Sequence, residues 1–109
     1  MFFVRYVIKY ANDKVEEEIK KFVMSLQKPM IEKILRAFDL LELFGNRVGL
    51  PHSKSMGGGL FELRIRGREE IRFFYTFKKG VIILSAFKKK TKKTPERELN
   101  TAIKRLHNI

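Results

Sequence analysis

Residues 60–88 read LFELRIRGREEIRFFYTFKKGVIILSAFK, and this stretch decides the fold. Its first two segments alternate apolar with polar residues, and its last segment is apolar at nearly every position. Alternation is typical of a strand with one buried face, whereas an apolar run is typical of a central strand covered on both sides. Turns are expected at Gly67 and Arg68 and at Lys79 and Gly80. The stretch therefore predicts an antiparallel meander of three strands: residues 60–66, 71–77 and 81–87.

Two helices are expected before the meander. Apolar residues recur at helical spacing over residues 15–26, and Asp13 with Glu16 resembles a capping box at the start of this helix. A second helix is predicted to begin near Pro29 and to end at Gly45, a residue that commonly terminates helices. Because the link between the two helices is short, we expect an antiparallel hairpin that packs its apolar stripes on the sheet.

The remaining segments complete the predicted order of elements. Aromatic and β-branched residues over residues 2–9 predict a first strand. Residues 47–59 show no periodicity, include a triplet of glycines, and predict a loop. Near the C-terminus, Thr94 is the expected cap of a last helix, with Pro95 at its first position and Leu106 in its apolar stripe.

These elements predict a single α+β domain over residues 1–109. Its sheet is expected to be predominantly antiparallel and four-stranded, with an N-terminal helix hairpin and a C-terminal helix. No apolar stretch approaches the roughly 20 residues that a membrane span requires, and the N-terminus lacks a signal-peptide layout. We therefore expect a soluble, cytoplasmic protein. The chain has no cysteine and only two histidines, His52 and His107, so we expect no metal site.

Positive charge is concentrated in the second half of the chain. There are 24 Lys and Arg against 12 Asp and Glu, a net charge of +12. Residues 1–50 carry nine basic and seven acidic residues, whereas residues 51–109 carry fifteen and five. This asymmetry favours a polyanionic partner such as nucleic acid. A charge excess that only improves solubility is an equally good explanation, and an anionic membrane surface is another, although no segment combines a basic face with a broad apolar one.

Cleavage of RNA needs few protein groups, because the ribose 2′-hydroxyl beside the scissile phosphate can act as the nucleophile. The protein must supply fixed cations, a group that takes the 2′ proton and a donor for the leaving 5′ oxygen. Arg64 and Arg72 lie on adjacent predicted strands and are expected to project from the same face, where two guanidinium groups could hold one phosphate. Either arginine alone is more simply explained as a solvated residue paired with Glu62 or Glu70.

Other residues are expected to converge on the same end of the sheet. Lys54 is the candidate general base, because crowded cations disfavour its protonation, and a plain phosphate contact is the alternative. His52 could shuttle protons and Phe87 could stack on a base, although a loop histidine is often incidental and an aromatic residue there is often core. The other residues expected to contact RNA are basic: Arg66, Lys90, Lys92 and Lys93.

Three segments of the chain together carry a family resemblance. They read LPHSKSMGGGLFELR at residues 50–64, IRFFY at residues 71–75 and AFKKKTKKTP at residues 86–95. This combined pattern resembles the phage-derived, HigB-like branch of the RelE/ParE toxin superfamily. The resemblance implies a RelE-like fold and the toxin half of a type II toxin–antitoxin pair. It also implies cleavage of mRNA on the translating ribosome without a cofactor, and neutralisation by a helix-turn-helix antitoxin.

The resemblance also implies roles for single residues. Lys54 matches the loop lysine of the family, Arg64 and Arg72 match arginines on two successive strands, and Lys88 and Lys89 match the basic pair after the last strand. These five are the implied catalytic residues of a metal-independent endoribonuclease. Some RelE toxins have a tyrosine near the end of the last strand, where this chain has a phenylalanine and lysines, so the proton donor and acceptor stay open. A ParE-like inhibitor of DNA gyrase and a non-catalytic RNA-binding module are the alternative functions.

Overall fold

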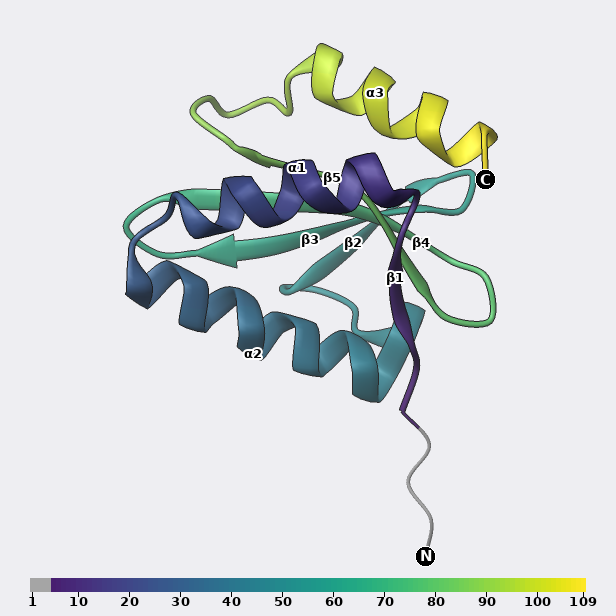
Figure 1. The fold of residues 1–109 in the computed structure, drawn as a ribbon, viewed down its shortest axis with the longest axis horizontal. Coiled ribbons are helices and arrows are strands. Elements are labelled where there is room, and N and C mark those ends of the chain that lie inside the picture. The colour runs from purple at the N-terminus through teal and green to yellow at the C-terminus, as the bar shows by residue number, and fades with distance from the viewer. Residues whose placement is uncertain (1–4) are drawn as a thin grey trace, which may run out of the picture.

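A computed structural model describes residues 5–109 as a five-stranded mixed sheet with helices on both faces (Figure 1). The strands lie in the order β1-β5-β4-β3-β2. They are β1 (Ile8–Tyr10), β2 (Ser53–Gly57), β3 (Leu60–Arg66), β4 (Glu70–Phe77) and β5 (Val81–Lys88). The helices are α1 (Asp13–Met24), α2 (Lys28–Phe44) and α3 (Glu96–His107), with a short 3-10 helix, η1 (Gly45–Arg47), after α2.

The α+β class and the predicted meander of β3, β4 and β5 are confirmed, but the prediction of four strands is wrong. The segment 47–59, predicted to be a loop, contains β2, which pairs antiparallel with β3 at the edge of the sheet. Its sequence is polar and lacks alternation, so only backbone pairing with β3 reveals it as a strand. The turn to β3 uses Gly58 and Gly59, both at positive φ, which glycine adopts at little cost.

The sheet is mixed because β1 runs parallel to β5, with Ile8 opposite Val81. The Val81 amide donates to the Val7 carbonyl at 2.8 Å, and the Ala11 amide donates to the Ile83 carbonyl at 3.0 Å. The first strand was expected over residues 2–9; β1 covers Ile8–Tyr10, and residues 2–4 lie outside the described part of the chain. The sequence shows that a strand exists here but not which strand it pairs with, because the partner lies some seventy residues along the chain.

The helix hairpin and the end of α2 at Gly45 are confirmed, whereas two predicted caps are wrong. Asn12, not Asp13, caps α1, since its side chain accepts from the Val15 amide at 2.9 Å. Thr94 makes no cap hydrogen bond to α3, which begins at Glu96. Its hydroxyl lies instead beside a carboxylate on the sheet, where it has a stronger acceptor.

The sheet has a core on each side. The larger one packs α1 and α2 against one face through residues such as Ile19, Leu41 and Phe73. The smaller one packs α3 against the other face and is formed by Leu60, Phe74, Leu84, Phe87 and Ala102. We call these the hairpin face and the α3 face. Figure 1 shows α2 and α3 on opposite sides of the strands. The expectation that β5 is central and covered on both sides is confirmed.

Across residues 5–109, no helix has the length and apolar character that crossing a membrane requires.

Candidate nucleic-acid interface

The register of the strands places the predicted cationic residues on one face. Arg64 lies opposite Arg72, and Lys54 lies opposite Glu62, two residues before Arg64 on β3. Residues directly opposite each other in a sheet point to the same side, as do residues two apart on one strand. Lys54, Arg64 and Arg72 therefore share the α3 face, although Lys54 lies on a strand rather than in the predicted loop.

Glu62 lies at the centre of this group and is 2% exposed. Its Oε1 accepts from Arg64 Nε at 3.0 Å and lies 3.8 Å from Arg72 Nε. Its Oε2 accepts from the Thr94 hydroxyl at 3.1 Å. A buried carboxylate needs such partners, because burial without them is costly. Glu62 thus fixes both guanidinium groups relative to each other and ties the segment before α3 to the sheet.

The two arginines differ in what they present to solvent. The Arg72 side chain is 4% exposed and donates from Nη1 to Glu70 Oε2 at 2.7 Å. Its Nε is buried without a hydrogen-bond partner in the described part of the chain. The Arg64 side chain is 20% exposed, and within residues 5–109 its ion pair is with Glu62 through Nε. The outer nitrogens of Arg64 are therefore the ones that a phosphate can reach from solvent.

The five lysines after the meander do not all lie beside Arg64 and Arg72. Lys88 lies opposite Ile71, a residue of the hairpin-face core, and its Nζ pairs with Glu69 at 3.1 Å. The structure therefore does not bring Lys88 beside Arg64 and Arg72. The Lys89 amide donates to the Glu70 carbonyl at 2.8 Å, which holds this residue at the end of β4. The other three are exposed on the link to α3: Lys90, Lys92 and Lys93.

The remaining predicted contact residues also have clear positions. Phe87 lies opposite Arg72 but is 5% exposed; its ring packs 5.6 Å from that of Phe74 in the core beneath α3. Arg66 is exposed, with Glu70 at 4.0 Å. His52 is exposed immediately before β2, and its carbonyl accepts from the Arg64 amide at 2.8 Å.

Two residues of the site were not singled out from the sequence. The sequence alone predicts Glu62 as a surface partner for an arginine and Thr94 as a helix cap. The alternation of β3 places Glu62 on the same face as Arg64, so its orientation could have been inferred. Its burial could not, because the cover comes from the segment around Thr94, which is 32 residues away in sequence.

No cluster of three or more His, Cys, Asp or Glu side chains that could hold a metal ion occurs within residues 5–109. The charged groups around Arg64 and Arg72 on the α3 face are the carboxylates of Glu62 and Glu70, the Lys54 ammonium group and the two guanidinium groups themselves. Such groups bind phosphate strongly where guanidinium nitrogens stay free to donate.

Comparison with known proteins assigns the chain to a family. The model of the family described as phage derived protein Gp49-like (DUF891) matches residues 17–107, which include α3, β2 to β5 and most of the helix hairpin. No curated protein shows a significant match to the chain. The match includes every residue of the cationic group on the α3 face. The chain therefore belongs to the phage-derived Gp49-like family, a RelE/HigB-type toxin family.

Proposed function

We propose that this protein is the toxin of a type II toxin–antitoxin pair and cleaves mRNA on the translating ribosome, in the cytoplasm and without a metal ion or other cofactor. The observation that carries the proposal is that Arg64 and Arg72 both pair with the carboxylate of Glu62 on one face of the sheet, where Lys54 lies opposite Glu62 on the neighbouring strand. Membership of a toxin family supports it independently. The proposed protein partner is a helix-turn-helix antitoxin, as the family resemblance implies.

The proposed reaction is transfer of the phosphoryl group within the RNA. The 2′ oxygen attacks the adjacent phosphorus while the bond to the 5′ oxygen breaks, which leaves a 2′,3′-cyclic phosphate and a free 5′-hydroxyl. The 2′-hydroxyl loses its proton to a base, and the leaving oxygen gains one. Arg64 has free nitrogens at the solvent-facing side of the group, so it is the proposed contact to the non-bridging phosphate oxygens. Arg72 is held between Glu62 and Glu70, so its proposed role is to position the Glu62 carboxylate that also binds Arg64.

Lys54 is exposed on the same face and has two roles open to it. It either adds an ammonium contact to the phosphate or accepts the 2′ proton. Lys54→Arg separates these roles, because an arginine keeps the positive charge but cannot act as a base near neutral pH. Cleavage that survives in Lys54→Arg and fails in Lys54→Ala would assign the lysine to phosphate binding. Loss in both variants would assign it to proton transfer.

The central test is induced expression of Arg64→Ala, followed by growth measurement and mapping of message 5′ ends. We expect cleavage to fall by a factor of about 10² to 10³, the usual cost of losing one donor to the transition state. Lys14→Ala, an exposed lysine on α1, is the control and should cleave as wild type does. If Arg64→Ala arrests growth and cuts messages at the wild-type rate, the proposed site is wrong.

The same experiment distinguishes the alternative functions. Intact messages together with DNA damage after induction of the wild type would indicate a ParE-like gyrase inhibitor. Salt-sensitive RNA binding without cleavage, even on ribosomes, would indicate a non-catalytic RNA-binding module.

A further inference from the structure

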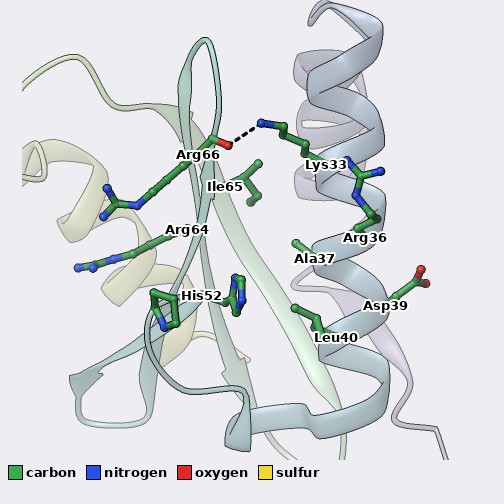
Figure 2. A pocket seen from close by; sticks show the side chains of 10 residues that line it. Lys33, Arg36, Ala37, Asp39, Leu40, His52, Arg64, Ile65 and Arg66 are labelled. Carbon is green, nitrogen blue, oxygen red and sulfur yellow. Dashed lines mark hydrogen bonds between the residues drawn. The ribbon is translucent and has the colours of Figure 1, made fainter.

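A groove of about 650 Å³ lies between α2 and the end of β3 (Figure 2). It exists because β2 does not run along the whole length of β3. The pairing of the two strands ends at Ser53 and Leu63, and the last backbone hydrogen bond is the one that the Arg64 amide donates to the His52 carbonyl. Beyond that point, Ile65 and Arg66 stay paired with β4 on one side, while their other side has no strand beside it and borders the groove next to α2. The Lys33 Nζ bridges the gap at one end by donating to the Arg66 carbonyl at 3.0 Å.

The groove has an apolar floor and a cationic rim. Figure 2 shows Ala37 and Leu40 of α2 facing Ile65 and the imidazole of His52. Lys33 and Arg36 supply positive charge on the α2 side, and Asp39 is the one acidic residue among the lining residues. Within residues 5–109, Lys33 and Arg36 form no salt bridge, so their charges are available to a ligand. A largely apolar floor with a few placed polar groups is typical of small-ligand sites.

This combination matches the chemistry of a nucleotide. The face of a base can lie on an apolar floor and stack on an imidazole ring, while the phosphate contacts the ammonium and guanidinium groups of Lys33 and Arg36. An uncharged ligand would make no use of those two cations, and an acidic peptide would make little use of the imidazole face. Charge and shape together therefore favour a segment of single-stranded nucleic acid.

The groove and the cationic group on the α3 face share one strand. The stems of Arg64 and Arg66 line the groove, whereas their guanidinium groups extend away from α2 (Figure 2). The Arg64 side chain spans from the groove to the α3 face, so an RNA strand bound at its guanidinium group can reach the groove around the edge of β3 that β2 leaves open. We propose that the groove binds a nucleotide that flanks the scissile phosphate of single-stranded RNA. This inference rests on the proposed function and adds a second contact region for the same substrate.

The test is an NMR titration of the full chain with a nonanucleotide in which every ribose carries a 2′-O-methyl group. The methyl group blocks the proposed nucleophile, so binding is measured without cleavage. We expect the amide signals of Ala37 and Leu40 to shift as the oligonucleotide is added. Arg36→Glu should raise the Kd about tenfold, since the loss of a charge-assisted phosphate contact is compounded by repulsion. The control Lys14→Glu changes the net charge by the same amount at an exposed position on α1.

The groove assignment is overturned if the shifts are confined to β2, β4 and the lysine segment, residues 88–93, and Arg36→Glu binds as tightly as Lys14→Glu. It is also overturned if Arg36→Glu loses a co-expressed protein partner but keeps its affinity for RNA, since the occupant would then be an acidic protein segment. The proposed function fails separately, when Arg64→Ala cleaves messages as wild type does. A loss of RNA affinity in Arg36→Glu would support the groove even in that case.

Discussion

The carboxylate of Glu62 is shared by groups from three different segments. Arg64 and Arg72 approach it from β3 and β4, and Thr94 approaches it from the link before α3. A carboxylate in water would gain little from such pairs, but this one is buried and has no solvent to replace a lost partner. Glu62 therefore acts as a positioning residue, which sets where the free nitrogens of Arg64 point.

We predict that Glu62→Ala lowers the free energy of unfolding by about 3 kcal/mol, because it removes the buried carboxylate that Arg64, Arg72 and Thr94 share and leaves Arg72 with Glu70 as its one ion pair within residues 5–109. Urea denaturation measures this. Glu69→Ala is the matched control, because it also removes one ion pair. That pair, between Glu69 and Lys88, is at the surface, and both of its side chains are 37% exposed. Its cost should be below about 1 kcal/mol. Equal costs for the two variants would mean that burial does not strengthen the Glu62 pair.

The buried hydroxyl of Tyr75 is expected to make the free energy of unfolding fall at high pH. Its hydroxyl forms a 2.6 Å hydrogen bond with Ser53 on β2, and burial raises the pKa of this tyrosine from its ordinary value of 10.0, with the Ser53 hydrogen bond lowering it in part. Below about pH 10 both folded and unfolded chains hold the proton, and the stabilisation is fully present. As the pH rises further, the unfolded chain loses the proton first, so the free energy of unfolding falls until the folded pKa is passed.

Tyr75→Phe removes this titration and should flatten the decline in stability that begins near pH 10, the ordinary pKa of tyrosine. Near neutral pH the same variant should cost about 1 kcal/mol, because the buried Ser53 hydroxyl loses its partner. Lysines titrate in the same range, so the measurement is the difference between wild type and Tyr75→Phe in urea denaturation at each pH. A difference that does not change with pH would contradict the prediction.

The end of α2 depends on Gly45. This residue has φ 57°, and a Cβ there would lie 2.8 Å from the Phe77 ring and 3.1 Å from the Tyr6 ring. Those two rings pack edge to face with centroids 5.0 Å apart, so neither can move away without loss of the other contact. The absence of a side chain at Gly45 thus allows the end of α2 to pack closely against Phe77 of β4 and Tyr6, which precedes β1.

We predict that Gly45→Ala lowers the free energy of unfolding by about 2 to 3 kcal/mol, from backbone strain and from overpacking against Phe77. Gly58→Ala is the control, because Gly58 also has positive φ, 61°, but a Cβ there meets nothing within 4 Å. Its cost should be only the backbone part, about 1 kcal/mol. Thermal denaturation of both variants separates strain from packing, and similar melting temperatures would rule out the packing contribution.

Helix α3 is attached to the sheet at both ends. Thr94 bonds to Glu62 just before the helix, and Arg105 near its end donates to the Leu84 carbonyl at 2.8 Å and pairs with Glu18 of α1 at 3.0 Å. Its apolar side covers Phe74 and Phe87. The position of α3 therefore determines how much of the α3 face is open beside Arg64.

The charge of the whole molecule is distributed in a way that suits a polyanion. Of the net charge of +12, the second half of the chain carries most, and this half includes β2 to β5, the lysine segment and α3. The lysine segment begins at the end of β5 and leads into α3. An extended RNA bound at Arg64 would thus meet positive charge on the link to α3 as well as in the α2–β3 groove.

Replacement of all five lysines of this segment with glutamine should make RNA binding less dependent on salt. For single strands, log K falls with log salt by about 0.7 per neutralised phosphate, so the slope should become shallower by about 2 to 3 if most of the five contact RNA. The measurement is fluorescence anisotropy with the 2′-O-methyl nonanucleotide over a salt series. The same replacement at Lys14, Lys20 and Lys21 of α1 is the control and should leave the slope unchanged. Equal slopes for wild type and the five-lysine variant would exclude the segment from the interface.

Much of the architecture follows from local patterns in the sequence. Period-two alternation in β3 and β4 placed Arg64 and Arg72 on one face, because the pleat of a strand allows no other arrangement. Helical spacing and Gly45 predicted the hairpin of α1 and α2, since these signals depend on residues a few positions apart. The face that carries the candidate site could therefore be predicted from the sequence.

Contacts between segments that are distant in the chain were decided only by the tertiary structure. Lys54 lies on a strand because residues 53–57 pair with β3. The first strand is parallel because it pairs with β5, and Lys88 lies on the opposite face of the sheet from Arg72. The burial of Glu62 and the opening of the groove beside Ile65 likewise depend on which segment covers a strand and where its neighbour stops. The physical reason is that periodicity reports the side of a strand on which a residue lies, whereas burial and partners are set by the segments packed against it.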